Sequence, residues 1–403
     1  MLITCLKTIE QHDPDILHCP DLNPANVKAQ TMYSEEPRRA WQSDSYGQAR
    51  RNFLNACEDA RCEVVSYPHP LRGPGGEALA TDIAWFGPRE AGKLLVMVSG
   101  VHGVEGFSGS ATQVGWIAGR GYDSLPADTA VLMVHLINPW GVAHLRRYTE
   151  GNVDLCRNFL DFSQPLPSNQ AYGAVHDQLS LGELLGDHGQ FAGRYLGKLL
   201  QQHGLEYVID LFMAGQYTYP DGFAFGGQRP EWSNTTLRDI LVSHKQYARQ
   251  VCVIEFHTGL GPWAYGELIT LHMDKELERV REWFGRWVFN PSADRQPGEE
   301  GYRVVPGHTI NAYKGSFANA EVTAVTLEFG TYPSSETLAL LIQEHLLVQH
   351  PGTANAADIE NIKGKLLEFH HPADWEWRCA FWSRSLQVIR QAFTGLGRAD
   401  NQT

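Results

Sequence analysis

Residues 96–111, VMVSGVHGVEGFSGSA, run from an apolar, strand-like stretch directly into a glycine-rich turn. The turn carries one histidine, His102, and one glutamate, Glu105, three residues further on. Gly103 and Gly106 have no side chains, so the backbone of the turn can approach a neighbouring group closely. Open α/β sheets gather functional side chains at the carboxyl ends of their strands, and this turn occupies such a position.

Short apolar runs rich in β-branched residues recur along the chain, bounded by Gly, Pro or Asn, and we predict that each is a buried strand. They cover residues 62–69, 92–100, 130–138, 206–212, 250–259, 266–273 and 324–331. Helical periodicity is found at residues 45–60, 108–119, 176–203, 233–250, 273–288 and 334–349. This alternation predicts an α/β fold with a mixed, mostly parallel central sheet and helices on both faces.

The pattern changes near both ends of the chain, so we expect three parts. Residues 1–45 mix Pro, Asp and Asn without a sustained period, and we predict an N-terminal extension there. Residues 46–350 hold the alternating strands and helices and are predicted to form one catalytic domain. Residues 351–403 are predicted to be a C-terminal helical region, in which residues 374–393 form an amphipathic helix.

The charge of the chain favours a small-molecule or peptide substrate. Its 403 residues include 46 acidic and 33 basic ones, which gives a formal net charge of −13. The chain also has no long run of basic residues, so we expect neither nucleic acid nor a membrane surface as its partner. Composition leaves the oligomeric state open.

The compartment is expected to be the cytoplasm. No window reaches the roughly 18 uninterrupted apolar residues of a membrane span, and the first residues lack the pattern of a signal peptide. The seven cysteines are scattered and form no CxxC pair. This distribution predicts reduced thiols rather than a disulfide framework or a cysteine zinc site.

Spacing alone does not make His102 and Glu105 a metal site, because His203 and Glu206 repeat it at the end of a helical run. The position after a buried strand separates the two pairs. A catalytic zinc site needs three protein ligands and an open position, and a His, Glu, His set offers suitable donors. His257 ends another apolar strand and is the candidate third ligand; a core histidine bonded to backbone is the alternative.

A long loop at residues 138–159 carries more planar polar groups than a connection requires. It holds Arg146, Arg147 and Arg157 together with Asp154. Guanidinium groups bind carboxylates in a bidentate manner, so these arginines indicate an anionic substrate or a developing oxyanion. The alternative for each is an internal Asp–Arg network that holds the loop in place.

Glu328 lies in the strand-like run at residues 324–331, just before Gly330. Alternation places it on the face opposite Leu327, and a buried carboxylate at a strand end requires a partner. A general base that activates a metal-bound water would be such a carboxylate. A helix N-terminal charge or an ion pair with an arginine is the alternative.

In order along the chain, the motifs HGVEG, NPWG, RR, VDLCRNF, EFHTG and TLEFG resemble those of the zinc carboxypeptidase superfamily, over roughly residues 46–335. This superfamily includes succinylglutamate desuccinylase and aspartoacylase. The chain is more similar still to an uncharacterised bacterial branch, defined by a domain of unknown function. The resemblance implies a zinc carboxypeptidase-like (phosphorylase/hydrolase-like) fold and a zinc-dependent metallopeptidase or amidohydrolase.

The resemblance also implies roles for individual residues. His102, Glu105 and His257 would bind one Zn²⁺ per chain, and Asp154 would orient His102 from behind. Arg147, preferred to Arg146 because of the Tyr that follows it, would polarise the scissile carbonyl group. Glu328 would act as the general acid/base.

Three further residues are predicted to bind the substrate, which would have an anionic end. Arg157 would anchor a carboxylate, with Asn158 beside it and Tyr302 as a proton donor. The family has Asn where this chain has Cys156, and a thiol is a much weaker hydrogen-bond donor. Strict carboxypeptidase specificity is therefore not implied, and a peptide C-terminus, an N-acyl amino acid and another amide all stay open.

The aromatic, Gly-rich segment at residues 214–234 is either a lid over the site or a rigid loop packed by its own side chains. Two rival functions are also open. GFSGS at residues 106–110 resembles a nucleophile elbow around Ser108, but it lacks the last glycine and lies too far from its strand. The other rival is a non-catalytic metal- or ligand-binding protein of the same fold.

Overall fold

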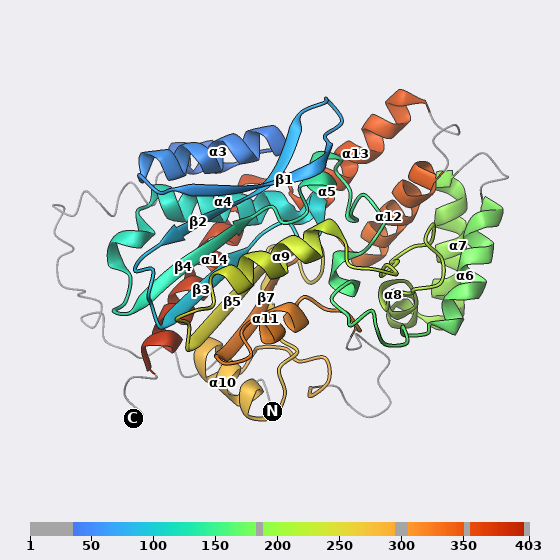
Figure 1. Cartoon of the computed structure of the whole chain (residues 1–403). Coiled ribbons are helices and arrows are strands. Elements are labelled where there is room, and N and C mark those ends of the chain that lie inside the picture. Colours follow the sequence, from blue (N-terminus) through green and yellow to red (C-terminus); the bar gives the residue numbers. More distant parts are fainter. Residues whose placement is uncertain (1–34, 183–187, 295–304, 350–354, 399–403) are drawn as a thin grey trace, which may run out of the picture. The chain divides into compact units, whose positions relative to one another are not determined.

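The computed structural model describes residues 35–182, 188–294, 305–349 and 355–398 (Figure 1). The chain divides after Arg39, and residues 40–403 form one compact unit. A short helix, α2 (Glu35–Trp41), spans the division, inside the segment predicted as an extension. Tyr302 belongs to residues 295–304 and lies outside the described residues.

A seven-stranded mixed sheet with the order β1-β2-β4-β3-β5-β7-β6 forms the centre of this unit. The four central strands, β4, β3, β5 and β7, pair in parallel. The three outer pairings, β1 with β2, β2 with β4 and β6 with β7, are antiparallel. The predicted α/β fold is confirmed, and the parallel part is the centre of the sheet. The strands are β1 (Val64–Arg72), β2 (Ala78–Phe86), β3 (Lys93–Val98), β4 (Thr129–His135), β5 (Gln250–Thr258), β6 (Gly266–Ile269) and β7 (Glu321–Phe329).

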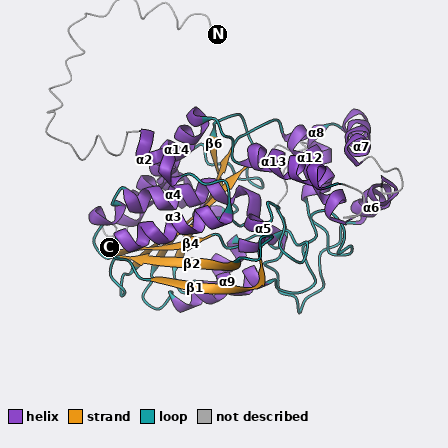
Figure 2. Ribbon diagram, turned by 90° about the horizontal axis from the view of Figure 1, so that it is seen from above, coloured by secondary structure: helices purple, strands orange, loops and turns teal. Residues whose placement is uncertain are grey.

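Helices cover both faces of the sheet, because the central strands are apolar on both sides. One face packs Met97 and Ile254 against α3 (Tyr46–Asp59), α4 (Gly106–Ala118), α10 (Asp274–Phe284) and α14 (Trp375–Arg398). The other face packs Val96 and Val253 against α9 (Trp232–Ser243) and α11 (Ile310–Ser316). Figure 2 shows α3 and α4 on one side of the strands and α9 on the other.

A further group of helices has its own core. It consists of α6 (Gln170–Gly182), α7 (His188–His203), α8 (Leu205–Met213), α12 (Ser334–Gln349) and α13 (Ala356–His370). The predicted helix at residues 176–203 is thus two helices, α6 and α7, and residues 183–187 between them lie outside the described residues.

The prediction of a strand at residues 206–212 is wrong, because these residues belong to helix α8. Val208, Leu211 and Phe212 are all buried. Their spacing of three and four residues is that of one helix face, whereas a short apolar run does not by itself distinguish a strand from a buried helix.

Strand β2 was not among the predicted strands, although it pairs with both β1 and β4. Its apolar run is interrupted by Thr81 and Asp82, which are fully buried. Arg50 of α3 neutralises Asp82 at 2.7 Å, so the carboxylate is tolerated inside the sheet. Helix α13 was likewise not predicted as a separate element.

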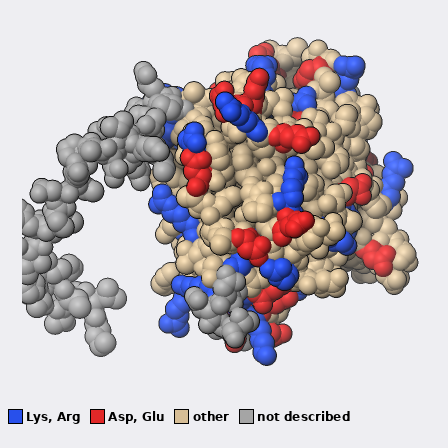
Figure 3. Space-filling view, turned by 60° about the vertical axis from the view of Figure 1, so that its left-hand side comes forward, with Lys and Arg blue, Asp and Glu red and all other residues tan. Residues whose placement is uncertain are grey.

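The described surface has two further features. No helix among the described residues is both long and apolar enough to span a membrane. On the face shown in Figure 3, Lys and Arg side chains are interspersed with Asp and Glu side chains. The described residues on that face therefore form no extended patch of one charge.

Candidate metal centre and pocket

The glycine-rich turn after β3 is folded tightly against the loop that carries the arginines. Gly100, at φ 73°, turns the chain out of the strand, and the short helix η2 (Gly103–Glu105) follows. A Cβ on Gly103 would lie 2.1 Å from the carbonyl carbon of Gly141, so only glycine fits. The Gly103 N–H donates to the carbonyl oxygen of Arg147 at 3.2 Å, which holds the arginine segment against the turn.

Sheet register brings the other predicted residues to the same edge. In the parallel pairing of β3 with β5, Val98 lies beside Glu255, so His257 extends just past the end of β3. In the pairing of β5 with β7, His257 lies beside Glu328. Directly paired residues point to the same face of a sheet, so His257 and Glu328 are neighbours on one face.

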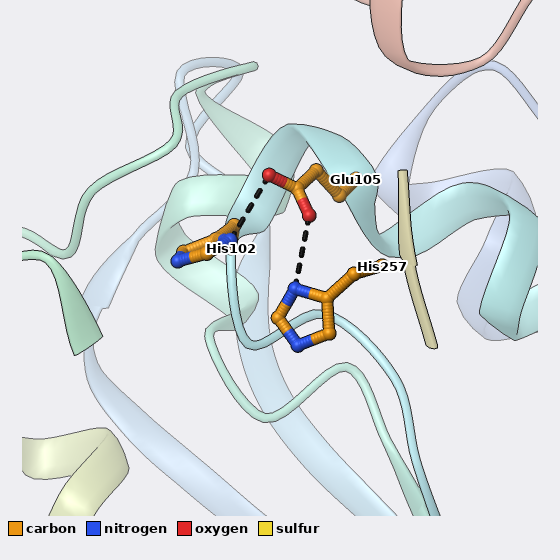
Figure 4. A group of neighbouring side chains, drawn as sticks. All are labelled: His102, Glu105 and His257. Carbon is orange, nitrogen blue, oxygen red and sulfur yellow. Dashed lines mark hydrogen bonds and ion pairs between the residues drawn. The ribbon is translucent and has the colours of Figure 1, made fainter. Parts of the chain in front are cut away.

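His102, Glu105 and His257 meet in one buried cluster (Figure 4). Nδ1 of His102 lies 2.9 Å from Oε1 of Glu105, and Nδ1 of His257 lies 3.1 Å from Oε2 of the same carboxylate. One ligand atom from each residue lies within 4.8 Å of the other two. The two rings thus present one nitrogen each to a single carboxylate, from two different strand ends.

The cluster fits a divalent metal ion. Nδ1 of His102 is buried and makes no hydrogen bond, although it lies close to Glu105. A buried nitrogen without a hydrogen bond costs free energy, and a metal ion between the two groups would satisfy it. Two imidazole nitrogens and a carboxylate oxygen are a donor set that suits Zn²⁺.

A second group with metal-like spacing consists of His102, Asp154 and Cys156. Here Nε2 of His102 already faces Oδ1 of Asp154 at 3.1 Å. Burial raises the pKa of the Cys156 thiol well above its usual range, so the thiolate that a metal needs is disfavoured. The first cluster is therefore the better candidate.

Asp154 lies on the outer side of His102, next to the ring nitrogen that faces away from Glu105. Its Oδ1 accepts from the backbone N–H of Cys156 at 3.0 Å, and its Oδ2 accepts from Nε of Arg147 at 3.3 Å. Burial acts to raise the pKa of Asp154, but the charges of Arg157, Arg147 and His102 outweigh it and hold that pKa well below its usual range. An ionised carboxylate behind an imidazole fixes the ring and its tautomer.

Glu255 takes the equivalent position behind His257, and the sequence analysis missed it. Its Oε2 lies 3.4 Å from Nε2 of His257 and accepts from Oγ1 of Thr309 at 2.9 Å, while Tyr313 donates to Oε1. Burial acts to raise the pKa of Glu255, but its contacts with His257 and Tyr313, together with the charge of His308, lower it to about 2. The i, i+2 spacing of Glu255 and His257 on one strand would have revealed the pair.

The two neighbouring arginines of the loop bind different partners. Nη1 of Arg147 donates to Oε1 of Glu105 at 2.8 Å, and its Nη2 lies 2.9 Å from Nε2 of His102. Nε of Arg146 instead donates to Glu344 of α12 at 2.9 Å. Arg147 is therefore part of the cluster, whereas Arg146 holds the loop to a helix.

Glu328 lies in the pocket next to the cluster. Its Oε1 accepts from the backbone N–H of Leu260 at 3.2 Å. Burial, followed by the negative charge of Glu105, raises the pKa of Glu328 to about 8. A carboxyl group with a pKa near neutrality can both accept and release a proton at ordinary pH.

Two of the predicted substrate-binding residues lie among the described residues, and only one of them lines the pocket. Arg157 lines the pocket, but Nε and Nη2 donate to the carbonyl oxygen of Met213 and Nη1 to that of Cys156. Asn158 does not reach the pocket, because its side-chain amide donates to the carbonyl oxygens of Gly226 and Arg229. The geometry gives Asn158 a role in holding this loop rather than in contacting a substrate.

The pocket is polar at the cluster and largely aliphatic elsewhere. Its polar side includes His102, Glu105, Arg147, His257, Glu328 and His370, and its apolar walls include Met213, Leu260, Ile269, Ile310, Leu338 and Leu341. The segment at residues 214–234 contributes no lining residue. Tyr217 and Phe223 of that segment are buried, and Tyr217 donates to the carbonyl oxygen of Arg157 at 2.6 Å. This geometry supports the rigid-loop alternative over the lid.

Ser108 is the candidate nucleophile if the protein were a serine hydrolase. It lies inside α4, is buried, and does not line the pocket. Its hydroxyl pairs with Nδ1 of His371 at 2.8 Å, and Asp44 lies 3.8 Å from the other ring nitrogen. These three residue types also make up catalytic triads. Ser108 and His371 are both buried, and neither lines the pocket.

Comparisons with known proteins identify the family. The family model described as "Protein of unknown function (DUF2817)" matches residues 42–384, and the chain belongs to this family. The predicted relation to an uncharacterised family is thereby confirmed. A comparison with curated proteins finds no match.

Similar solved structures come from three enzymes, among others. Succinylglutamate desuccinylase from Chromobacterium violaceum is 15% identical, with 78% of this chain and 79% of that chain covered and a TM-score of 0.34. Murein-tripeptide amidase MpaA from Escherichia coli O157 is 16% identical, with coverage of 70% and 91% and a TM-score of 0.31. A metallo-carboxypeptidase from Burkholderia cenocepacia is 14% identical, with coverage of 76% and 69% and a TM-score of 0.37. Likenesses at this level do not establish an activity for this chain.

Proposed function

We propose that this protein is a zinc-dependent hydrolase that cleaves an amide bond. The observation that carries the proposal is the meeting of His102, Glu105 and His257 in one buried cluster, beside a second carboxylate, Glu328, on the neighbouring strand. The motif resemblance to zinc carboxypeptidases supports the same assignment. Three protein ligands would leave one coordination position open for a water, as in catalytic zinc sites.

The three ligands would hold the metal ion through Nδ1 of each histidine and the carboxylate of Glu105. A bound zinc ion would supply Lewis acidity and would lower the pKa of a water toward about 7. Glu328 would take up a proton from the attacking water and would pass it to the leaving nitrogen. Its raised pKa, about 8, suits a group that holds the proton between these two transfers.

Two cations in the pocket favour a substrate with negative charge. Arg147 would stabilise negative charge that develops on the carbonyl oxygen, since its guanidinium lies against the cluster. Arg157 lines the same pocket and would hold an anionic end of the substrate with the N–H groups that its backbone partners leave free. A peptide C-terminus and an N-acyl amino acid both have this chemistry.

The first test measures metal content per chain in protein purified without added metal. We expect near one zinc per chain in the wild type and none in His102→Ala or His257→Ala, because each change removes one of three ligands. His203→Ala is the matched control, since His203 has the same spacing to a glutamate but is exposed at the end of α7. It should keep its metal.

The second test follows hydrolysis of a panel of N-acyl amino acids and C-terminally blocked and free dipeptides. Removal of zinc by a chelator should abolish turnover, and added zinc should restore it. Glu328→Gln should keep its metal and lose about 10²- to 10⁴-fold in kcat, which is the usual contribution of a general base. A wild-type protein that binds no zinc, even when zinc is supplied, would contradict the proposal. Bound zinc without hydrolysis of any probe would favour a metal- or ligand-binding protein of the same fold.

A further inference from the structure

His370, the last residue of α13, reaches the pocket from the far end of the chain. It is buried and lines the same pocket as His102, Glu105 and Glu328. No motif of the family resemblance includes it, because it follows Glu328 by more than one helix. The region predicted as C-terminal and helical thus contributes a side chain to the candidate site.

Two hydrogen bonds fix the position of His370 against the end of β5. Oγ1 of Thr258 donates to the carbonyl oxygen of His370 at 2.6 Å, and Nδ1 of His370 lies 3.3 Å from the carbonyl oxygen of Thr258. Thr258 itself directly follows His257, and its N–H donates to Oε2 of Glu105 at 3.3 Å. The ring is therefore tied to the same strand end that carries the metal ligands.

These contacts decide the tautomer of His370. A carbonyl oxygen can only accept a hydrogen bond, so Nδ1 must carry the proton that it donates to Thr258. Burial lowers the pKa of His370, which favours the neutral ring, so Nε2 is then the unprotonated nitrogen and acts as an acceptor. That nitrogen is buried and has no hydrogen-bond partner among the described residues. A buried acceptor in this state is stabilised by a hydrogen-bond donor, which a substrate in the pocket can supply.

We propose that Nε2 of His370 accepts a hydrogen bond from the N–H of the scissile amide. The inference rests on the proposed function, which makes the substrate an amide. An acceptor nitrogen cannot bind the carbonyl oxygen or a carboxylate, so the N–H is the group of the reacting bond that matches it.

The test compares an amide with the matching ester, which has an oxygen in place of the N–H. The probes are an N-acyl dipeptide that ends in phenylalanine and the corresponding depsipeptide that ends in phenyllactate. His370→Asn places an amide N–H near Nδ1 and keeps the bond to Thr258, but it removes the acceptor at Nε2. We expect kcat/KM for the amide to fall about ten-fold or more, because its N–H is left unpaired. The value for the ester should change by less than about two-fold.

Two further variants separate this role from a structural one. His370→Gln can place its side-chain oxygen near the position of Nε2, so it should recover part of the amide activity. His371→Asn alters the next residue, which is equally buried but pairs with Ser108 outside the pocket. It should leave the ratio of amide to ester activity unchanged, even if it lowers the melting temperature.

The possible results distinguish a failure of the His370 assignment from a failure of the proposed function. If His370→Asn lowers amide and ester activity equally while the metal content stays at the wild-type value, the assignment to the amide N–H is overturned and the proposed function stands. If the wild type hydrolyses neither these probes nor the wider panel, the proposed function fails and this inference fails with it. A selective loss for the amide supports both.

Discussion

Arg146 and Arg147 are adjacent in the sequence, yet they belong to two buried charge networks that differ in what surrounds them. Arg146 pairs with Glu344 of α12, which also binds Lys363 of α13 at 2.6 Å. We call these three residues the helix network. Arg147 pairs with Glu105, one of the three candidate metal ligands, and with Asp154 behind His102.

The helix network is absent from the pocket lining, and Oε1 of Glu344 accepts hydrogen bonds from both cations. The network around Arg147 lines the pocket and contains a buried histidine nitrogen without a hydrogen bond. Burial and charge are common to both, so neither property marks a site. An unsatisfied polar atom beside a pocket is what separates the metal cluster from a structural ion pair.

The largest difference should come from breaking the helix network. Glu344→Gln leaves the buried Arg146 and the partly buried Lys363 without their shared negative partner, so we expect a loss of about 3–5 kcal/mol in the free energy of unfolding. The measurement is unfolding by urea, followed by circular dichroism. Metal content per chain should not change, because no member of this network lies among the candidate ligands.

Glu336→Gln is the matched control for this experiment. It neutralises an exposed carboxylate of the same helix and should change the free energy of unfolding by less than about 0.5 kcal/mol. A Glu344→Gln protein that lost its metal but kept its stability would reverse the assignment of the two networks.

A smaller effect, on metal affinity, is expected from the two carboxylates that lie behind the candidate ligand histidines. Asp154→Asn and Glu255→Gln each remove a charge that faces the outer nitrogen of a ligand histidine. Losses of this kind weaken metal affinity by about 10- to 100-fold, since the ring loses its orientation and part of its basicity. Competition with a chelating dye measures the affinity for zinc. Equal affinity in the wild type and both variants would show that the two carboxylates do not support the ligands.

The fold and the meeting of the candidate ligands were largely predictable from the sequence because both depend on strands. β3, β5 and β7 are apolar runs that the sheet buries on both faces, and such runs are recognisable without a structure. His102, His257 and Glu328 follow or end these strands, so their meeting at one edge could be expected. The helix α8 was mistaken for a strand because a short apolar run fits either element.

The remaining site residues depend on contacts that the sequence does not encode locally. Glu255 was recognisable in retrospect from its position two residues before His257. His370 was not, because only the packing of α13 against the end of β5 brings it to the pocket. The positions of the Arg157 and Asn158 side chains also depend on backbone carbonyl groups of distant segments.

The last prediction concerns pH and the helix network. His345 follows Glu344 in α12, is buried, and packs against Tyr148 and Phe223. Burial, followed by the positive charge of Arg146, lowers the pKa of His345 from 6.5 to about 4. The folded protein therefore holds this ring neutral at pH values where the unfolded chain takes up a proton.

The direction in which stability changes with pH follows from proton uptake by the unfolded chain. Above pH 6.5 neither state is protonated at His345, so its contribution to stability is fully present, and it is lost as the pH falls from 6.5 toward about 4. The expected slope from this one group is about 1.4 kcal/mol per pH unit within that window. In His345→Gln the slope of unfolding free energy against pH should be smaller by that amount, whatever the absolute stability of the variant. An unchanged slope would mean that His345 is protonated in the folded protein, and that the helix network carries a third positive charge beside Glu344.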